Sequence, residues 1–354
     1  MSESEIQNSD LPAASKIERL LAQVALTEDD KAEHFPENKI RPTQFSEFPG
    51  QERARKNLQI YVQAAKMRGQ ALDHVLLHGP PGLGKTSLAR IIAHELQVSF
   101  FQTSGPVLDK AGDLAGILAG LERNSVLFID EIHRLPTVIE EILYSAMEDF
   151  EIDIVVGQGP TARSVKLPVP RFTLIGATTK MASLSSPLVS RFGIKERFEY
   201  YDDPSLCKII QRTANIEGAK ISPRGIEELA ARSRGTPRIA NRLLRRVYDF
   251  AEVQNATEIS EVIVDYALTC MEIDRRGLEP LDRKILATIA HRYSGGPVGI
   301  ETLSYTVGEE RSTIEDVYEP YLVHRGFLVR GPRGRELTEL AVQHLQETKI
   351  LSTL

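Results

Sequence analysis

The chain has 354 residues, a formal net charge of −6 and 42% hydrophobic residues, a composition typical of a globular protein with two or three domains. No apolar run approaches the length of a transmembrane helix, and no basic-then-apolar leader opens the sequence, so we expect a cytoplasmic protein without a membrane segment. Its two cysteines, Cys207 and Cys270, show no metal-binding or redox spacing, which fits a reducing compartment.

The acidic charge is concentrated at the N-terminus. Residues 1–33 contain eight acidic and three basic side chains, a net charge of −5, so the rest of the chain is close to neutral. A near-neutral body neither supports nor excludes a nucleic-acid partner, and local basic patches must decide. We expect residues 1–33 to form a disordered acidic extension with one amphipathic stretch, in which the apolar residues are Ile17, Leu20, Leu21 and Val24.

Prolines shape the next segment. Residues 35–50 contain prolines at positions 36, 42 and 49, and proline disrupts a helix interior because it lacks the N–H group and its ring clashes with the preceding turn. We therefore predict an extended strap that leads into a helix over residues 51–68.

The most informative motif is GPPGLGKT at residues 79–86, which separates an apolar run at 74–78 from an apolar-periodic segment starting at Leu88. Strand, glycine-rich loop and helix are the context of a phosphate-binding loop. The glycines let backbone N–H groups turn toward a phosphate, and the helix N-terminus adds its positive end. We predict that Lys85 reaches the terminal phosphates of ATP and that the Thr86 hydroxyl binds Mg²⁺. The alternative is a plain glycine turn.

Between residues 73 and 198, strand patterns alternate with helical ones, at 74–78, 87–96, 126–130, 138–147 and 172–176. This alternation predicts an α/β fold with a parallel sheet covered on both faces. Two segments depart from it. Residues 109–121 form a small-residue helical stretch, and residues 152–167 contain two strand-like runs around a Gly-Gln-Gly-Pro turn. The second pattern predicts a β-hairpin inserted at 151–168. We place the large domain at residues 34–201.

Two acidic residues end the strand pattern at 126–130. Asp130 and Glu131 follow Lys85 by about 45 positions, and the carboxyl ends of parallel strands meet where a phosphate loop also lies. We predict that Asp130 supports the Mg²⁺ shell and that Glu131 orients and activates the water that attacks the terminal phosphate. A surface acid pair is the alternative.

Two further features belong to the same machinery. Thr178 and Thr179 follow the strand pattern at 172–176, where hydroxyls can sense the terminal phosphate or simply cap the following segment. Arg191 ends a short helix and is placed to face the nucleotide of a neighbouring subunit, where a guanidinium neutralises transition-state charge and is worth about 10³-fold or more in rate. A surface ion pair is an equal alternative for Arg191.

Residues 202–272 contain helical patterns alone, and we assign them to a small all-helical domain with helices at 204–215, 222–234, 236–254 and 259–271. An Asp, Ser or Thr near a proline marks the start of several of these helices. Arg238 lies in the first turn of the third helix, where a cation opposes the helix dipole. This position favours a compensating anion, such as the phosphate of a bound nucleotide.

The C-terminal residues 273–354 change character. Helical patterns at 281–293, 299–307 and 311–325 precede two short runs, 327–329 and 336–338, that flank the turn at 331–334 as in a hairpin, which predicts a winged-helix domain. The third helix of such a domain usually enters the major groove. Here that helix and its approach are acidic, so phosphates would repel it and it is a poor candidate for reading bases; the acids are Glu309, Glu310, Glu315, Asp316 and Glu319.

The predicted wing is basic instead. Arg325, Arg330, Arg333 and Arg335 fall within eleven residues that contain no acid. Arginines on a glycine-proline turn suit phosphate contacts, which give affinity without sequence information. We predict DNA binding through the wing, with a solvated basic loop as the alternative.

Taken together, these motifs resemble the AAA+ ATPases and, within them, the RuvB family of bacterial motors that drive Holliday-junction branch migration. The resemblance covers about residues 35–345. Its matching segments are residues 79–86, 127–134 (LFIDEIHR), 176–179 (GATT), 235–242 (GTPRIANR), 295–299 (GGPVG) and 309–321 (EERSTIEDVYEPY).

The resemblance implies a homohexameric ring that encircles duplex DNA and couples ATP hydrolysis to translocation. It implies that Ile40 and Arg41 flank the adenine and that Arg191 acts in trans. It also implies docking on the junction-binding partner RuvA through the hairpin at 151–168, and the resolvase RuvC in the complete assembly. The further nucleotide and Mg²⁺ contacts are Gly82, Gly84, Lys85, Thr86, Ser87, Glu148, Asp149, Phe150, Tyr201 and Arg238, and the DNA contacts include Arg330 and Arg335.

Some features depart from the family pattern, and other functions stay open. The acidic N-terminal extension of about 20 residues before the strap is longer than the family leads us to expect, and Ile40 stands where leucine is common. Many other AAA+ proteins have asparagine where this chain has Thr178 and Thr179, although the threonines match the RuvB branch itself. An AAA+ loader or initiator that binds DNA without translocating is the first alternative to a motor, and a nucleotide-gated regulator without turnover is the second. The complete set of Lys85, Asp130, Glu131 and Arg191 argues against the regulator.

Overall fold

The computed structural model describes residues 37–156 and 163–348. The chain divides into two compact units, Met1–Arg41 and Pro42–Leu354. The first contains α2 (Glu37–Ile40). The acidic extension at 1–33 and its amphipathic stretch lie outside the described residues. The strap contains no long helix after Pro42, where the short 3₁₀ turn η2 (Phe45–Glu47) precedes α3 (Glu52–Arg68), as predicted.

The large domain contains a five-stranded parallel sheet in the order β2-β3-β6-β1-β7. The strands are β1 (Val75–His78), β2 (Phe100–Ser104), β3 (Val126–Asp130), β6 (Thr173–Thr178) and β7 (Ile194–Arg197). The three central strands consist of buried residues apart from a less buried last residue in β1 and β3, because both faces of the sheet are covered. β2 and β7 are absent from the sequence prediction, since they are edge strands that are only partly buried.

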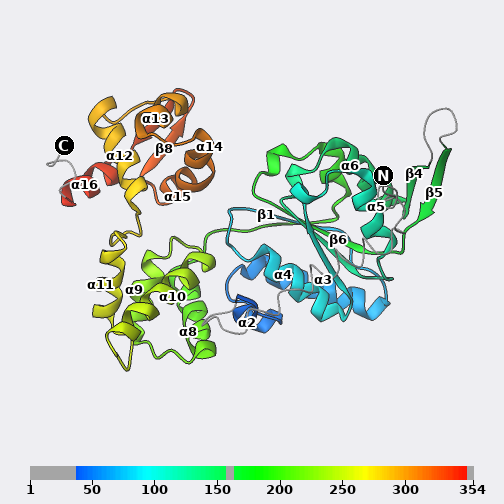
Figure 1. Cartoon of the computed structure of the whole chain (residues 1–354), viewed down its shortest axis with the longest axis horizontal. Helices are drawn as coiled ribbons and strands as arrows, with labels where there is room; N and C mark the ends of the chain where they lie inside the picture. Colours follow the sequence, from blue (N-terminus) through cyan, green and yellow to red (C-terminus); the bar gives the residue numbers. More distant parts are fainter. Residues whose placement is uncertain (1–36, 157–162, 349–354) are drawn as a thin grey trace, which may run out of the picture. The chain divides into compact units, whose positions relative to one another are not determined.

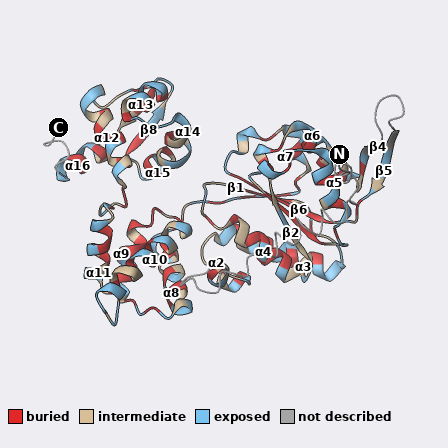
Figure 2. Ribbon diagram, in the orientation of Figure 1, coloured by how far each residue is buried: buried red, intermediate tan, exposed pale blue. Residues whose placement is uncertain are grey.

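Layers of helices cover both faces of the sheet (Figure 1), and alternate residues of the strands pack into two separate hydrophobic clusters. Val75 and Leu77 pack with Leu88 in one hydrophobic cluster, whereas Leu76 packs with Leu143 in the other. The first layer contains α3 and α4 (Lys85–Leu96), and the second contains α5 (Ala111–Ala119), α6 (Thr137–Glu148) and α7 (Ser186–Arg191). Buried residues accordingly line the inner sides of these helices (Figure 2). Short 3₁₀ turns lie at Gly105–Val107, Ile132–Arg134 and Met181–Ser183.

The predicted hairpin projects from this domain (Figure 1). It consists of β4 (Glu151–Val156) and β5 (Arg163–Pro168), which pair in antiparallel register from Glu151 opposite Pro168. The predicted Gly-Gln-Gly-Pro turn at 157–160 lies outside the described residues.

A lid of four helices follows, as predicted: α8 (Asp203–Glu217), α9 (Pro223–Arg232), α10 (Pro237–Val253) and α11 (Glu261–Cys270). Side-chain caps begin α8, α9 and α11. The Asp202 carboxylate accepts a hydrogen bond from the Ser205 N–H at 3.0 Å, and the Ser222 hydroxyl accepts one from the Gly225 N–H at 3.1 Å. These caps satisfy backbone donors that lack an intrahelical partner.

The C-terminal head is a winged helix, also as predicted. It contains α12 (Pro280–Tyr293), α13 (Ile300–Val307), a third helical segment and the wing β8 (Leu328–Gly331) and β9 (Gly334–Leu337). The third segment is interrupted: α14 (Arg311–Thr313) and α15 (Glu319–His324) flank a π-helical turn at Ile314–Tyr318. Pro320 lacks the N–H that a regular helix needs there. α16 (Glu339–Glu347) is an addition to the predicted elements.

A buried ion pair joins the lid to the head. The Arg234 guanidinium donates to both carboxylate oxygens of Asp282, at 2.9 and 3.2 Å, and its Cζ lies 4.2 Å from the centre of the Tyr321 ring. Asp282 is fully buried, and this burial raises the pKa of its carboxyl to about 6, although the charge of Arg234 opposes the shift. No helix among the described residues is long and apolar enough to cross a membrane.

Candidate nucleotide and DNA sites

The glycine-rich loop joins β1 to α4 and has a backbone that needs its glycines. Gly79, Gly82 and Gly84 have φ angles of 142°, 75° and 93°, in the region that side chains disfavour. A Cβ atom on Gly82 would lie 2.7 Å from Thr236 Cγ2, and one on Gly79 would lie 2.4 Å from the Phe198 carbonyl oxygen. The loop therefore has the glycine-dependent geometry that turns backbone N–H groups toward an anion.

Lys85 lies inside this loop. Its side chain is buried, and its ammonium donates to the carbonyl oxygens of Gly79 at 2.9 Å and Pro80 at 2.8 Å. Burial lowers the pKa of Lys85 to about 8; the charge of Asp130 opposes this shift, and the charge of Arg238 adds to it. A buried cation of this kind is suited to an anionic ligand, because a phosphate would supply the missing negative charge.

The two acids lie where the sequence places them, at the carboxyl end of the sheet, next to the loop in strand order. β3 ends at Asp130 and is separated from β1 by β6 alone. Glu131 adopts a left-handed backbone conformation, with a φ of 47°, and its exposed carboxylate pairs with Arg134 at 3.0 Å. The Thr86 hydroxyl and the Asp130 carboxylate are oxygen donors of the kind that Mg²⁺ prefers.

The two threonines have different environments. Thr178 is buried at the end of β6, and its Oγ1 accepts from the Lys180 N–H at 2.9 Å and shares a hydrogen bond of 3.1 Å with His133 Nδ1. Thr179 is exposed. His133 is therefore a hydrogen-bonding partner of Thr178, and burial lowers its pKa. Thr178 links the end of β6 to the segment that follows Glu131.

Two predicted contacts reach the loop from the lid side. The Arg238 N–H donates to the Gly82 carbonyl at 3.3 Å, and the Tyr201 hydroxyl donates to the Leu83 carbonyl at 3.2 Å. Tyr201 is buried, which raises the pKa of its phenol. Both residues therefore contact the phosphate loop itself.

Arg191 and Glu148 lie at the opposite, amino end of the sheet. Gly193, two residues after Arg191, lies beside Asp73, and Ile194 then pairs with the first residue of β1. The imidazole of His74 is hydrogen-bonded to the carbonyl of Met147 at 3.3 Å, which places the end of α6 there too. The Arg191 guanidinium pairs with Glu148 at 2.9 Å.

Asp149 and Phe150 follow Glu148 directly, and Phe150 stacks against Arg171 at 4.5 Å. The predicted nucleotide contacts thus form two groups separated by the length of β1, about 10 Å for a strand of this size. Ile40 and Arg41 belong to the other compact unit. Gly82, Gly84, Lys85, Thr86 and Ser87 all lie in or directly after the loop.

The wing corrects one expectation about DNA. Arg335 is buried rather than exposed: it donates to Glu319 from Nε at 3.0 Å and from Nη2 at 2.7 Å, and from Nη2 to Glu315 at 2.9 Å. Arg330 is 59% exposed, with longer ion pairs to the same two acids, and Arg333 is exposed at the turn. Arg335 therefore holds the wing to the third helical segment, and two of that segment's acids are neutralised from within the head.

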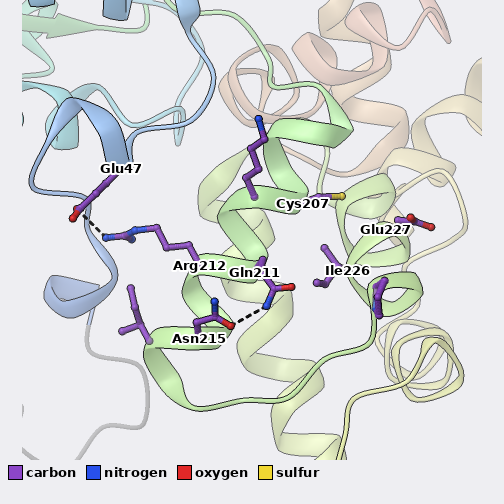
Figure 3. Close-up of a pocket in the computed structure, with 10 residues that line it drawn as sticks. Glu47, Cys207, Gln211, Arg212, Asn215, Ile226 and Glu227 are labelled. Atoms are coloured by element: carbon purple, nitrogen blue, oxygen red, sulfur yellow. Dashed lines mark hydrogen bonds and ion pairs between the residues drawn. The ribbon is translucent and has the colours of Figure 1, made fainter.

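A cleft of about 720 Å³ lies apart from these groups, between η2 and the lid helices α8 and α9 (Figure 3). An ion pair of 3.3 Å between Glu47 and Arg212 crosses it, and Cys207, Gln211 and Ile226 help to line it. None of the predicted nucleotide contacts that the structure describes lines this cleft, so it is distinct from the candidate nucleotide site.

Three family models match the chain in succession. The first, described as the Holliday junction DNA helicase RuvB P-loop domain, matches residues 40–198; the RuvB AAA lid domain matches 201–274, and the RuvB C-terminal winged helix domain matches 275–346. The chain belongs to the RuvB family. It therefore has the fold of an AAA+ P-loop ATPase with a helical lid and a winged helix.

Solved structures of RuvB proteins agree with this assignment. The chain is 51% identical to the Thermotoga maritima RuvB Holliday junction branch migration motor, with a TM-score of 0.79, and the match covers 87% of this chain and 98% of that one. A mutant form of Thermotoga maritima RuvB matches with the same identity and coverage and a TM-score of 0.80. The ORC2 protein of Aeropyrum pernix, at 17% identity and a TM-score of 0.55 over 91% of this chain and 99% of that one, shares the fold.

Two residues of this RuvB-family chain were not singled out from the sequence although they contact predicted site residues. Arg134 pairs with Glu131, and its spacing of three positions on a helical turn is a pattern that sequence can show. Tyr144 stacks on Arg191 from a different helix, and no local pattern indicates that contact.

Proposed function

We propose that this RuvB-family chain is an ATP-driven DNA motor that branch-migrates Holliday junctions as a homohexameric ring on duplex DNA. The observation that carries the proposal is the division of the nucleotide contacts. The phosphate loop, Asp130 and Glu131 lie at one end of the sheet, and Arg191 lies at the other. A ring in which Arg191 meets the next subunit's loop would complete each site from two chains.

The residues at the loop have distinct tasks in this proposal. Lys85 binds the β- and γ-phosphates of ATP, and the loop N–H groups hold them in place. Mg²⁺, held by Thr86 and Asp130, would neutralise the phosphate charge. Glu131 orients the attacking water, which requires its carboxylate to leave Arg134. Arg238 and Tyr201 transmit the state of the loop to the lid, since both contact it directly.

The phosphate sensor is proposed to be the pair of threonines, with different tasks. Thr179 is exposed at this end of the sheet and can face a nucleotide. Thr178, with its hydroxyl engaged by Lys180 and His133, would transmit the position of Thr179 to the segment that carries Glu131.

The remaining contacts concern partners. Arg330 and Arg333 are proposed to bind DNA phosphates without reading sequence, since both are exposed on the wing. The hairpin β4–β5 is proposed to dock on RuvA, and RuvC would complete a resolving assembly. Val165 on β5 is 49% exposed, which offers an apolar contact of the kind that a docking hairpin needs.

The test is branch migration of a synthetic four-way junction with mobile arms, with ATP and Mg²⁺, in the presence and absence of RuvA. We expect ATP-dependent separation into duplexes that RuvA enhances. Lys85→Ala should lose nucleotide binding, and Glu131→Gln should bind ATP without turning it over. ATP hydrolysis with tight DNA binding but no strand separation would place the chain among AAA+ loaders instead.

A further inference from the structure

The surroundings of Arg191 are more ordered than those of a surface arginine. Its guanidinium carbon lies 4.6 Å from the centre of the Tyr144 ring, and Nη1 donates to the Pro187 carbonyl at 2.8 Å. Its side chain is 20% exposed. Side chain and backbone contacts from α6 and α7 thus fix the orientation of the Arg191 guanidinium. A fully solvated arginine would lack such contacts.

Tyr144 is itself fixed from behind. Its hydroxyl donates to the Glu140 carboxylate at 2.8 Å and lies 2.9 Å from the Ser185 hydroxyl, which in turn donates to Glu140 at 2.6 Å. Glu140 is buried. The Ser185 oxygen also accepts from the Leu188 N–H at 3.4 Å and so caps α7, the helix that carries Arg191. Displacement of the tyrosine hydroxyl would break this partly buried network.

The other partner of Arg191 is weaker. Glu148 is 57% exposed, and an exposed ion pair contributes about 0–1 kcal/mol because water screens it. The ring contact is retained when Glu148 moves away, since it needs no counter-charge. The Arg191 Nε is buried and has no hydrogen-bond partner among the described residues. An unpaired buried donor is costly, so the other contacts of the side chain, with the Tyr144 ring and the Pro187 carbonyl, must hold the guanidinium in this position.

We propose that Tyr144, anchored by Glu140 and Ser185, is the positioning residue for Arg191. Its ring holds the guanidinium in the orientation that meets the phosphates of the adjoining subunit, and the exposed Glu148 gives way to that stronger anion. The inference rests on the proposed function, in which Arg191 acts in trans. Preorganisation of this kind matters because a displacement of about 1 Å in a catalytic group can cost about 10²-fold in rate.

The test compares turnover in the full-length protein with DNA, ATP and Mg²⁺. Tyr144→Leu and Tyr144→Met remove the ring face, whereas Tyr144→Phe keeps it and loses the hydroxyl. Tyr61→Leu on α3, a tyrosine that is 40% exposed and has no assigned role, is the matched control. We expect kcat to fall about 10- to 10²-fold in the Leu and Met variants, with less loss in Phe, no loss in the control, and KM and nucleotide Kd unchanged throughout.

Mixing separates positioning from general damage. Tyr144→Leu subunits keep an intact phosphate loop, so mixing them with Lys85→Ala subunits, which keep an intact Tyr144 and Arg191, should restore part of the turnover. If Tyr144→Leu instead damaged the structure of its own subunit, mixing would not recover turnover. If Tyr144→Leu lowers the melting temperature, the same experiment is carried out with Tyr144→Met.

Arg191→Ala distinguishes the two levels of the proposal. In one outcome, Arg191→Ala loses turnover while Tyr144→Leu and Tyr144→Met keep a kcat within about twofold of the unmodified protein. That change is far smaller than the loss expected for a displaced catalytic group. In this case Tyr144 does not position Arg191, but Arg191 still acts in trans. If Arg191→Ala itself turns over normally, the trans role fails and the positioning role fails with it.

Discussion

At the scale of single residues, Lys85 shows how burial prepares a site for its ligand. The ammonium is held by two carbonyls of its own loop, and its pKa is lowered to about 8 because burial disfavours the charged form. A bound phosphate would favour that charged form and raise the pKa again. Binding and protonation of Lys85 are therefore linked.

This linkage predicts proton uptake on nucleotide binding. Between about pH 8 and 9 a growing fraction of free sites carries neutral Lys85, and binding should restore the proton, so nucleotide affinity should fall as pH rises through this range. Calorimetric titration of ADP in buffers of different ionisation enthalpy measures the uptake. The same titration at about pH 7, below the folded pKa, is the control, with little uptake expected. Equal heats in all buffers at the higher pH would contradict the assignment.

The same lowered pKa has a consequence for stability. In the unfolded chain the Lys85 ammonium has a pKa of about 10.4, whereas in the folded chain its pKa is about 8. The unfolded state therefore holds more protons between these values, and the contribution of Lys85 to the free energy of unfolding rises with pH across that window. Bound nucleotide should abolish this rise.

At the scale of elements, the wing and the third helical segment are held together by charges. Glu315 and Glu319 accept from the buried Arg335, while the exposed Arg330 lies 3.4 to 3.5 Å from the same acids. The two arginines are close in sequence and chemically identical, yet their exposure assigns them different tasks. Arg335 holds the wing to the third helical segment, and Arg330 is the one we propose to contact DNA.

We predict that Arg330→Ala lowers DNA affinity evenly across sequences and reduces the slope of log K against log salt by about one. Arg335→Ala should instead destabilise the head by about 3–5 kcal/mol, because it removes the main partner of a buried acid. Salt titrations of DNA binding and urea unfolding followed for both variants separate the two effects. A reduced salt slope with unchanged stability in Arg335→Ala would show that Arg335 leaves its acids to bind DNA.

The joint between lid and head allows a matched comparison of buried and exposed ion pairs. Removing Arg234 leaves the fully buried Asp282 without its charged partner, so Arg234→Ala should cost about 3–5 kcal/mol. Arg242→Ala, on the following helix, removes an exposed arginine that pairs with Glu279 at 2.8 Å, and it should cost less than about 1 kcal/mol. Urea unfolding measures both. Equal losses in the two variants would mean that the joint does not depend on the buried pair.

At the scale of the whole molecule, the sequence predicts the order of domains and the catalytic end of the sheet, because glycine loops, apolar strands and proline-marked helix starts are local patterns. The edge strands β2 and β7 escape prediction since they lack a long apolar run. The burial of Arg335 and the contact between Tyr144 and Arg191 escape it as well. Both depend on which distant elements the fold brings together.

The division of the nucleotide contacts predicts complementation between defective subunits. Arg191→Ala should bind nucleotide with little turnover, and Lys85→Ala should not bind it. Mixed rings should recover part of the turnover, because the Lys85→Ala subunit supplies Arg191 to the intact loop of its neighbour. The measurement is steady-state ATP hydrolysis across mixing ratios, with native mass spectrometry of subunits that carry tags of different mass to verify mixed rings. Mixed rings without recovery would place Arg191 in its own subunit's site or outside any site.

The separation of Arg191 from the phosphate loop by the length of β1 also bears on inheritance. In a closed ring, each chain would supply its phosphate loop to one site and Arg191 to the next, so a chain with a faulty Arg191 would impair the adjoining site alone. In a cell that makes normal and faulty copies together, faulty chains would enter the same rings as normal ones, and a ring whose sites must act in turn would lose more motor activity than the faulty share of its protein. Substitutions at Arg191 or Tyr144 should therefore behave as dominant alleles, whereas those that prevent the chain from folding or entering the ring should be recessive.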